Sequence, residues 1–418
     1  MTTGTGAGRE RGRGGLSRRE LLAAGVALGT TVAPRAVRVA APRRSALVVG
    51  AGAFGGWSAL HLLRRGFEVT LVDAWGPGNS RASSGGETRV IRGSYGARGV
   101  YTRLTARAFE LWKEHDAARG SRLFHPVGVL WMHGADDSFL RESIPHLDAS
   151  GLRHERLDAR AAAARWPQID WRGLAGALWE PDSGYLDARR ACADVVAAFT
   201  AAGGRFVLDG ARPVVARGEA AVELDGGGRL AADHIVFACG PWLSRLFPDV
   251  IGVRIRPTRQ EVFFFGTPAG EPRFAPPQMP VWADPSGERM FYGIPGNDAR
   301  GFKVADDTRG EPIDPTTLER TPSPAALERA RAFLARRFPA LAGAPLVEAR
   351  VCQYENSPDG DLIFDRHPEA ANLWLLGGGS GHGFKLGPAL GEHVAGVVAG
   401  ETAPEPAFGL ARFAKPES

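Results

Sequence analysis

The stretch Leu47-Val48-Val49-Gly50-Ala51-Gly52-Ala53-Phe54-Gly55-Gly56 decides the fold of this chain. Its apolar first residues predict a strand that stops at a glycine, and segment 57–65 behind it is compatible with a helix. The glycines match G-x-G-x-x-G, which allows a tight turn, close approach of the backbone to a pyrophosphate, and close packing of helix on strand. The helix N-terminus then offers unpaired N–H groups to the phosphates. We therefore predict a dinucleotide site at Gly50, Gly52, Ala53, Phe54 and Gly55.

An acidic residue at the expected distance strengthens this interpretation. With 55 glycines in 418 residues, the glycine pattern alone would match easily by chance. A second strand-like run, 67–72, ends at Asp73. Nucleotide-binding folds of this type place a carboxylate about 20 residues beyond the glycines, where it holds a ribose hydroxyl. We assign that role to Asp73.

The charge of the chain is unevenly distributed. The whole sequence carries a net charge of +5. Residues 1–44 hold nine Arg and two Glu, a net of +7, so the remainder carries +5 − 7 = −2. The basic balance belongs to the leader, and we expect no nucleic-acid partner. No run reaches the ~18 uninterrupted apolar residues of a membrane helix, so we also expect no stable membrane anchor.

The leader has the pattern of an export signal. Ser17-Arg18-Arg19-Glu20-Leu21-Leu22 precedes the apolar stretch 21–34, and this arrangement resembles a bacterial twin-arginine signal. We expect export of the folded protein, with cleavage between residues 33 and 44. The alternative is an N-terminal extension with an accidental Arg pair, in which case the protein would be cytoplasmic.

A second glycine-rich turn lies near the far end of the chain. The buried strand predicted at 373–376 runs into Gly377-Gly378-Gly379-Ser380-Gly381-His382-Gly383, ahead of a helix at 390–398. Both ends of the chain are therefore expected to build one cofactor site. An apolar strand at 234–238 ends in Cys239-Gly240-Pro241 and suits a return to the same sheet. A helix is predicted to begin at 184–187, with Asp187 as its N-cap, and to run through Ala202.

The middle of the chain predicts a different architecture. Segments 260–265, 289–292 and 301–304 read as short strands between Pro/Gly turns, which favours an antiparallel sheet. The predicted fold is mixed α/β, with a Rossmann-type dinucleotide-binding domain and a second, antiparallel-sheet substrate domain. We assign 45–98, 184–245 and 346–410 to the first domain and 99–183 and 246–345 to the second.

Cysteine and lysine are both scarce. Cys192, Cys239 and Cys352 are too few for a disulfide framework, and each is by default a core residue. Only four lysines occur, against 51 − 4 = 47 arginines, and Lys303 and Lys385 both sit in the tripeptide Gly-Phe-Lys. A surface side chain is the plainer alternative for each. For Arg89 and Arg92, spacing alone leaves surface salt bridges open.

Three further stretches, taken together, resemble a known family. They are Gly86-Glu87-Thr88-Arg89-Val90-Ile91-Arg92, Val351-Cys352-Gln353-Tyr354 through Asp365-Arg366-His367-Pro368, and Ser380-Gly381-His382-Gly383-Phe384-Lys385. In this order and spacing the sequence resembles the monomeric sarcosine oxidase / N-methyltryptophan oxidase family of FAD-dependent amine oxidases, within the D-amino-acid oxidase superfamily. The resemblance covers about residues 45–410.

The resemblance implies a reaction and its partners. The family oxidises an amine carbon–nitrogen bond of a small amino acid, passes a hydride equivalent to FAD, and reduces O2 to H2O2. It also implies a monomer without a metal. A flavin dehydrogenase with another electron acceptor, or a non-catalytic flavin-binding protein, is the competing interpretation. A nicotinamide dehydrogenase is disfavoured by the second glycine-rich turn.

The resemblance also implies residue roles. Cys352 matches the cysteine that holds FAD through a thioether at the flavin 8α carbon; otherwise it is a buried strand cysteine. Arg92 and Lys385 match the pair that binds the substrate carboxylate, and Lys303 matches the lysine that promotes reaction with O2. The remaining assignments are Tyr95 and Tyr292 in the substrate pocket, His382 near the flavin ring, Arg89 at the cofactor, and Gly378, Gly379, Gly381 and Gly383 where the backbone approaches the ring.

Three positions depart from the family pattern. Asp307 stands where sarcosine oxidases usually carry a histidine, four residues after the oxygen-site lysine. Gly85 replaces a second pocket histidine, and Glu355 stands where a neutral residue is common. These positions shape the space around the substrate amine. We therefore expect a larger or more cationic amino acid than sarcosine.

Overall fold

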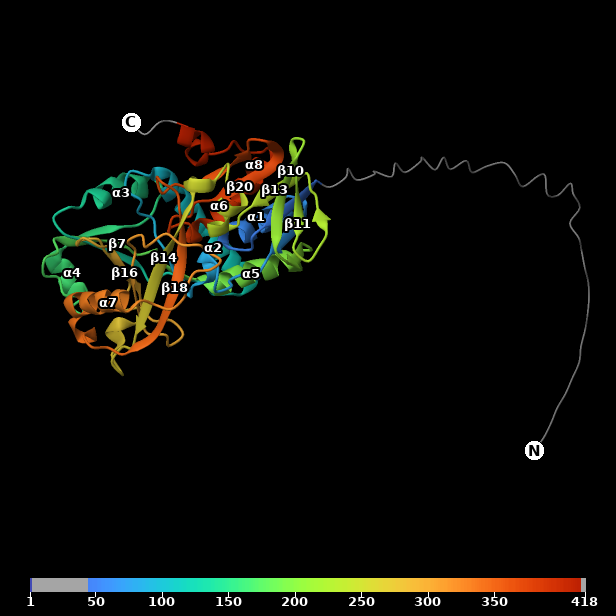
Figure 1. Cartoon of the computed structure of the whole chain (residues 1–418). Coiled ribbons are helices and arrows are strands. Elements are labelled where there is room, and N and C mark those ends of the chain that lie inside the picture. Colours follow the sequence, from blue (N-terminus) through green and yellow to red (C-terminus); the bar gives the residue numbers. More distant parts are fainter. Residues whose placement is uncertain (2–43, 415–418) are drawn as a thin grey trace, which may run out of the picture. The chain divides into compact units, whose positions relative to one another are not determined.

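The computed structural model describes Met1 and residues 44–414, so the twin-arginine leader lies outside the described residues. A six-stranded sheet carries the first glycine turn (Figure 1). Its strand order is β19-β20-β13-β1-β2-β9, and all neighbours are parallel except β19 and β20. The bounds are β1 Ser45–Val49, β2 Glu68–Asp73, β9 Arg205–Leu208, β13 His234–Phe237, β19 Ile363–His367 and β20 Ala370–Gly377.

The two faces of this sheet are covered differently, as the alternation of β1 requires. Ala46 and Val48 point to one face and join the core formed with helices α1, α2, α5 and α8. Leu47 and Val49 point to the other and pack with Ala220 of a small three-stranded sheet. The bounds are α1 Ala53–Arg64, α2 Gly99–Arg119, α5 Ala188–Ala201, α8 Gly387–Ala399, β10 Ala211–Ala216, β11 Glu219–Leu224 and β12 Arg229–Leu230.

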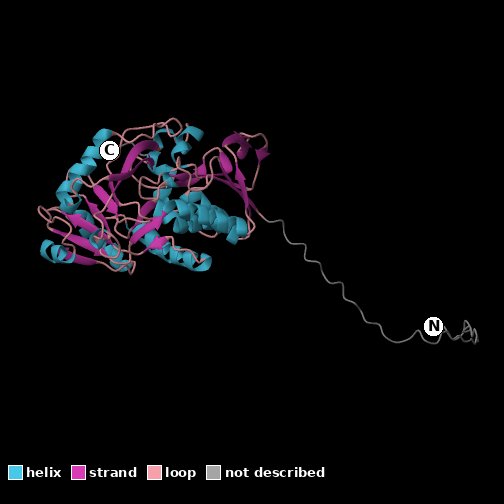
Figure 2. Ribbon diagram, turned by 90° about the horizontal axis from the view of Figure 1, so that it is seen from below, coloured by secondary structure: helices cyan, strands magenta, loops and turns pink. Residues whose placement is uncertain are grey.

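An eight-stranded sheet forms the other large layer (Figure 2). Its order is β18-β14-β17-β16-β15-β5-β7-β6, antiparallel except for the β15–β5 pair. An aromatic core in which Trp282 stacks on Phe333 joins it to α7. The bounds are β5 Val129–His133, β6 Glu155–Asp158, β7 Gly176–Glu180, β14 Arg256–Phe265, β15 Val281–Asp284, β16 Phe291–Ile294, β17 Phe302–Asp306, β18 Leu346–Asn356, α3 Ser138–Ala149, α4 Ala159–Arg165 and α7 Pro324–Arg337.

The prediction of mixed α/β architecture is confirmed, with parallel and antiparallel sheets in one chain. Strand β18, which the sequence grouped with the cofactor-binding segments, pairs along β14 as the edge of the eight-stranded sheet. Within residues 44–414, no helix combines the length and apolar character needed to cross a membrane.

One predicted helix start is wrong. Residues 184–187 form strand β8 (Gly184–Asp187), which pairs with β3 (Thr88–Ile91) and β4 (Phe124–His125), and the helix begins only at Ala188. Asp187 precedes the helix without a side-chain capping bond. Its carboxylate instead accepts from Arg190 at 3.0 Å and lies 3.1 Å from His125 Nε2. Asp187 therefore holds the predicted N-cap position, whereas pairing with strands distant in sequence makes 184–187 a strand.

Candidate cofactor and substrate site

The first glycine turn is tight because the backbone leaves no room for a side chain. Gly50 has φ of +105°, and a Cβ there would lie 2.4 Å from the carbonyl oxygen of Ala238 in the segment after β13. A Cβ on Gly55 would lie 1.8 Å from the Gly50 oxygen. The first and third glycines therefore bring β1, α1 and the end of β13 together, as a phosphate-binding turn requires.

Asp73 closes this turn from the neighbouring strand. Its carboxylate accepts hydrogen bonds from the backbone N–H groups of Ala51 at 2.7 Å, Trp75 at 2.9 Å and Gly76 at 2.8 Å. These bonds fix the orientation of a carboxylate whose oxygens retain further acceptor capacity. The position fits the predicted bond to a ribose hydroxyl.

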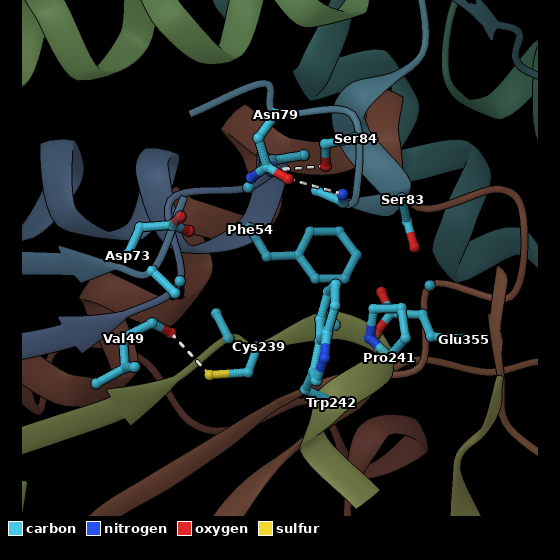
Figure 3. Close-up of a pocket in the computed structure, with 18 of the residues that line it drawn as sticks. Val49, Phe54, Asp73, Asn79, Ser83, Ser84, Cys239, Pro241, Trp242 and Glu355 are labelled. Atoms are coloured by element: carbon cyan, nitrogen blue, oxygen red, sulfur yellow. Dashed lines mark hydrogen bonds between the residues drawn. The ribbon is translucent and has the colours of Figure 1, made fainter. Parts of the chain in front are cut away.

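Both glycine-rich turns line one cavity of about 280 Å³ (Figure 3). Phe54 of α1 and Trp242 of the loop after β13 project into it, with Asp73 at one side and Glu355 of β18 at another. The predicted cofactor-binding residues that line it are Gly50, Gly52, Ala53, Phe54, Asp73, Arg89, Gly379, Gly381 and Gly383. The expectation that the two chain ends build one site is confirmed.

The residues of this cavity fit FAD. Glu355 is buried, and its Oε2 atom has no hydrogen-bond partner among residues 44–414. Burial raises the pKa of this carboxyl group to about 7, against the opposing effect of the Gly379 and Gly378 backbone N–H groups. A buried acceptor of this kind requires a donor, and FAD brings N–H and O–H groups to the same cavity as its pyrophosphate.

A second cavity of about 180 Å³ adjoins the first at Ala82, Arg89 and Tyr354. It is lined by Lys303, Tyr292 and Cys352. Arg89 donates to Ser83 O at 2.6 Å and Thr88 O at 2.9 Å, and its Nη2 lies 3.3 Å from Cys352 Sγ. Arg89 is therefore an internal residue that joins the two cavities, and the surface salt-bridge alternative does not apply to it.

Lys303 lies buried at the centre of β17. Its Nζ donates to Thr88 O at 3.1 Å and sits 5.6 Å from the Tyr292 ring centre. Burial, and then the neighbouring Arg89 charge, lower the pKa of Lys303 to about 7. Burial also raises the pKa of Tyr292 to about 12, so that phenol stays neutral. The surface alternative for Lys303 is excluded.

Arg92 and Lys385 are brought together around one aromatic ring. Arg92 Cζ lies 4.4 Å and Lys385 Nζ 4.9 Å from the Tyr95 ring centre. Arg92 donates to Ser94 O, and Lys385 donates to His382 O at 2.8 Å. Burial and then the Arg92 charge lower the pKa of Lys385 well below its usual value. Two adjacent cationic groups of this kind, Lys385 buried and Arg92 half-buried, can bind a carboxylate, which offsets their mutual repulsion.

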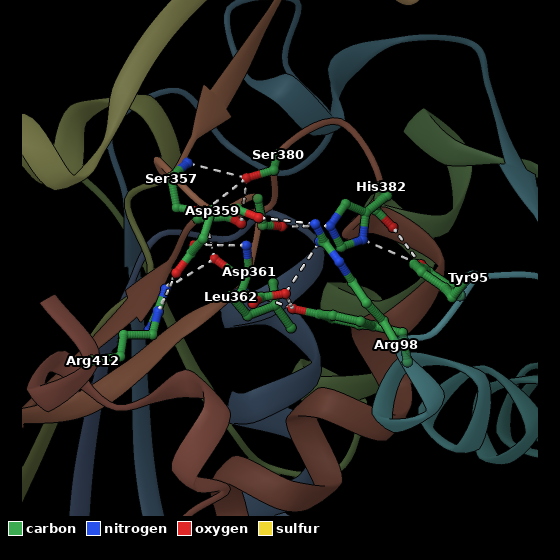
Figure 4. Close-up of polar contacts among 12 residues, drawn as sticks. Tyr95, Arg98, Ser357, Asp359, Asp361, Leu362, Ser380, His382 and Arg412 are labelled. Carbon is green, nitrogen blue, oxygen red and sulfur yellow. Dashed lines mark hydrogen bonds and ion pairs between the residues drawn. The ribbon is translucent and has the colours of Figure 1, made fainter. Parts of the chain in front are cut away.

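His382 uses both ring nitrogens within the protein (Figure 4). Its Nδ1 lies 3.2 Å from Tyr95 Oη, and its Nε2 lies 2.9 Å from Gly360 O. Because a carbonyl oxygen only accepts, Nε2 carries the proton and Nδ1 accepts from Tyr95. Burial, then the nearby Lys385 charge, lower the pKa of His382 to about 3. His382 therefore positions the 379–385 loop and does not exchange protons near neutral pH.

The sequence did not assign a role to two carboxylates at this site, Glu180 and Asp307. Glu180 accepts from Gly93 N at 2.6 Å, Ser94 Oγ at 2.5 Å and Trp131 Nε1 at 3.0 Å, and so holds the loop after Arg92. No local pattern marks it. Asp307, noted only as a departure, accepts from Tyr354 Oη at 2.6 Å.

Comparisons with known proteins agree with this site. The family model for FAD dependent oxidoreductases matches residues 45–397. The chain belongs to this family. N-methyl-L-tryptophan oxidase from Salmonella arizonae is 31% identical over 88% of this chain and 97% of its own length. Monomeric sarcosine oxidase from a Bacillus strain is 29% identical over 84% of this chain and 91% of its own.

Solved structures show the same fold. L-proline dehydrogenase from P. horikoshii superposes with a TM-score of 0.77 at 20% identity, covering 89% of this chain and 98% of that one. The family model and the sequence relatives make the chain an FAD-dependent amine oxidoreductase, similar to sarcosine oxidase and N-methyltryptophan oxidase. The sequence prediction of the family is confirmed.

Proposed function

We propose that this enzyme oxidises the Cα–N bond of a small amino acid, N-methylated or with a primary amine, and reduces O2 to H2O2. The observation that carries the proposal is the pair Arg92 and Lys385, which share the Tyr95 ring beside the 379–385 loop. The glycines of this loop line the cofactor cavity. The relatives are named for amino-acid substrates, and the pair supplies what an amino-acid carboxylate needs.

Each protein group has a defined part in this reaction. FAD, when bound, accepts the hydride and later gives the electrons to O2. Arg92 and Lys385 bind the carboxylate and so hold the α-carbon in a fixed position. When it is protonated, the Lys303 side chain stabilises the negative charge that develops as O2 is reduced.

We also propose that Cys352 holds FAD covalently. A thioether at the flavin 8α carbon replaces one S–H and one C–H bond by an S–C bond. The two hydrogens removed leave with O2 as H2O2, so the step is balanced. The support is the position of Cys352 on the second cavity, beside Arg89, where the two cavities meet.

The oxidase proposal is tested by separating the two half-reactions. Purified enzyme is mixed anaerobically with a panel of amino acids and their N-methyl derivatives while the flavin absorbance is recorded, and air is then admitted. We expect bleaching followed by fast recovery with stoichiometric H2O2. Slow recovery in air, with fast recovery on an artificial electron acceptor, would instead identify a dehydrogenase. No bleaching with any amine would favour a non-catalytic flavin protein.

The covalent bond is tested by denaturation. Wild-type protein precipitated in acid should retain its yellow colour, and Cys352→Ser should release it. Cys239→Ser is the matched control, because Cys239 lines the first cavity but is not the proposed attachment point. Flavin release from the wild type would reject the covalent proposal and leave the FAD assignment intact.

We further propose export by the twin-arginine route, on the strength of the Arg18-Arg19 pair ahead of an apolar stretch. Cell fractionation of the full chain tests this, with the double change Arg18→Lys and Arg19→Lys as the comparison. Equal distribution of both forms in the cytoplasm would reject the proposal.

A further inference from the structure

The carboxylate of Asp307 lies near cationic side chains of both sites, Lys303 at the second cavity and the pair Arg92 and Lys385. It follows directly after β17, four residues beyond Lys303, and its backbone N–H donates to Met290 O at 2.8 Å. Its side chain accepts one hydrogen bond, from Tyr354 Oη at 2.6 Å. The charges that act on it come from Arg92, Lys385 and the neighbouring Asp306.

Asp307 is connected to the two cavities by Tyr354, which lines both and donates to its carboxylate. Burial is the main cause that raises its pKa, yet part of its surface is accessible. Arg92, Tyr292 and Tyr354 are also partly accessible although residues beside them in the chain are buried. Tyr292 and Tyr354 line the second cavity, so the Asp307 carboxylate bound by Tyr354 lies at the border of that cavity.

Comparison with Glu180 shows that Asp307 is incompletely satisfied. Glu180 accepts five hydrogen bonds, from Gly93 N, Ser94 N and Oγ, Trp131 Nε1 and Ser183 Oγ. It is therefore a structural carboxylate with no need of a ligand. Among residues 44–414, the Tyr354 hydroxyl is the one side-chain donor to Asp307, and a half-buried carboxylate with one neutral donor retains acceptor capacity.

A bound amino acid would worsen this imbalance. Its carboxylate would take up Arg92 and Lys385, the two cationic groups that favour the ionised form of Asp307. Asp307 would then be a buried anion close to a second anion, which is costly unless a positive charge arrives with the substrate. The α-amine is a poor source of that charge, because it must be unprotonated to give up a hydride.

We propose that Asp307 binds a cation in the substrate side chain, so that the enzyme prefers amino acids with a side-chain ammonium or guanidinium over neutral ones of the same length. The proposal rests on the amino-acid oxidase function and names its substrate class. A charge-assisted hydrogen bond predicts a preference of about 10- to 100-fold in kcat/KM.

The test compares isosteric pairs in the FAD-containing enzyme. The rate of anaerobic flavin reduction is measured for lysine and norleucine and for arginine and citrulline. Each compound is tested with and without N-methylation. The wild type should prefer the cationic member of each pair, and Asp307→Asn should lose the preference while it still oxidises the neutral member. Asp306→Asn is the matched control, because Asp306 pairs with Arg289 at the surface.

A binding measurement that needs no turnover accompanies these rates. Anaerobic titration of 6-aminohexanoate against hexanoate, followed by the shift of the flavin spectrum, should show tighter binding of the aminated acid to the wild type only. This comparison also stands if Asp307→Asn fails to fold, because the wild type alone must prefer the cationic analogue.

The outcomes distinguish a failure of the role proposed for Asp307 from a failure of the proposed oxidase function. Equal rates and equal binding for cationic and neutral members in the wild type overturn the role of Asp307 and leave the oxidase function intact. A uniform loss with every substrate in Asp307→Asn also overturns it, because Asp307 would then act on the α-amine. If no amino acid reduces the flavin, the proposed function fails, and the analogue titration still decides what Asp307 binds.

Discussion

The two Gly-Phe-Lys tripeptides place their lysines in opposite kinds of structure. Lys303 lies inside β17, where it pairs with Phe264 on one side and Ile294 on the other. Lys385 lies in a short 3-10 turn, Phe384–Leu386, ahead of α8. Both are buried, and each donates to one backbone carbonyl, of Thr88 and of His382 respectively.

The difference lies in the surroundings of the two ammonium groups. Lys303 faces Arg89 and Cys352 at the second cavity, whereas Lys385 faces Arg92 and Tyr95. Burial lowers the pKa of both, so each is poised to gain a negative partner. In the proposed function the two lysines act in different half-reactions, Lys303 at O2 and Lys385 at the substrate carboxylate.

Replacing Lys303 should separate the half-reactions most strongly. In Lys303→Met, reoxidation of the reduced enzyme by O2 should slow by about 10²- to 10³-fold, the loss typical of one preorganised electrostatic group. Anaerobic reduction by substrate should change little. Stopped-flow absorbance measures both, with the exposed Lys113→Met as control. Reoxidation of Lys303→Met at the wild-type rate would contradict the role of Lys303 in the reaction with O2.

Replacing Lys385 should have the opposite and smaller effect. In Lys385→Met, the apparent substrate Kd for flavin reduction should rise by about 10- to 100-fold, because one charge-assisted hydrogen bond to the carboxylate is lost. The rate of reoxidation by O2 should be unchanged. A fall in the O2 rate comparable with that of Lys303→Met would show that both lysines act in one step.

The effect of pH on reoxidation by O2 should be smaller than the effects of these two substitutions. It should distinguish the Lys303 site from the Lys385 site. The lowered pKa of Lys303, about 7, means that its charged form prevails below that pH and is lost above it. Reoxidation by O2 should therefore slow as pH rises, by about tenfold per unit beyond the midpoint. The midpoint lies at or above 7, because a negatively charged reduced flavin would favour the ammonium. Lys303→Met should abolish this dependence, and persistence of the slope in the variant would assign it elsewhere.

Local rules predicted the cofactor turn well. Gly55 is required by a clash with the backbone of Gly50, and Gly50 by its positive φ, so the spacing of the two glycines carries this information. The clash of Gly50 with Ala238, in contrast, depends on the tertiary structure. The scarcity of lysine singled out Lys303 and Lys385, because composition can be counted from the sequence without the tertiary structure. The helix start at 184–187 failed because strand β8 depends on β3 and β4, which lie far away in the sequence.

His382 shows the limit of residue-by-residue reasoning. A histidine in a flavin-proximal loop suggested chemistry, but its two nitrogens are engaged by Tyr95 and by the carbonyl of Gly360. Glu180 shows the converse, because its five donors come from three separate segments of the chain. No pattern around either residue contains that information.

The sequence by itself determined the nucleotide-binding turn, the family and the residues that deserved attention. Only the tertiary structure decided how their charges act on one another. It placed Arg92, Asp307, Tyr354 and Lys385, from four distant segments, close to one another. The physical reason is that turn geometry is encoded over a few residues, whereas desolvation and Coulomb interaction depend on burial and on distances that only the folded chain sets.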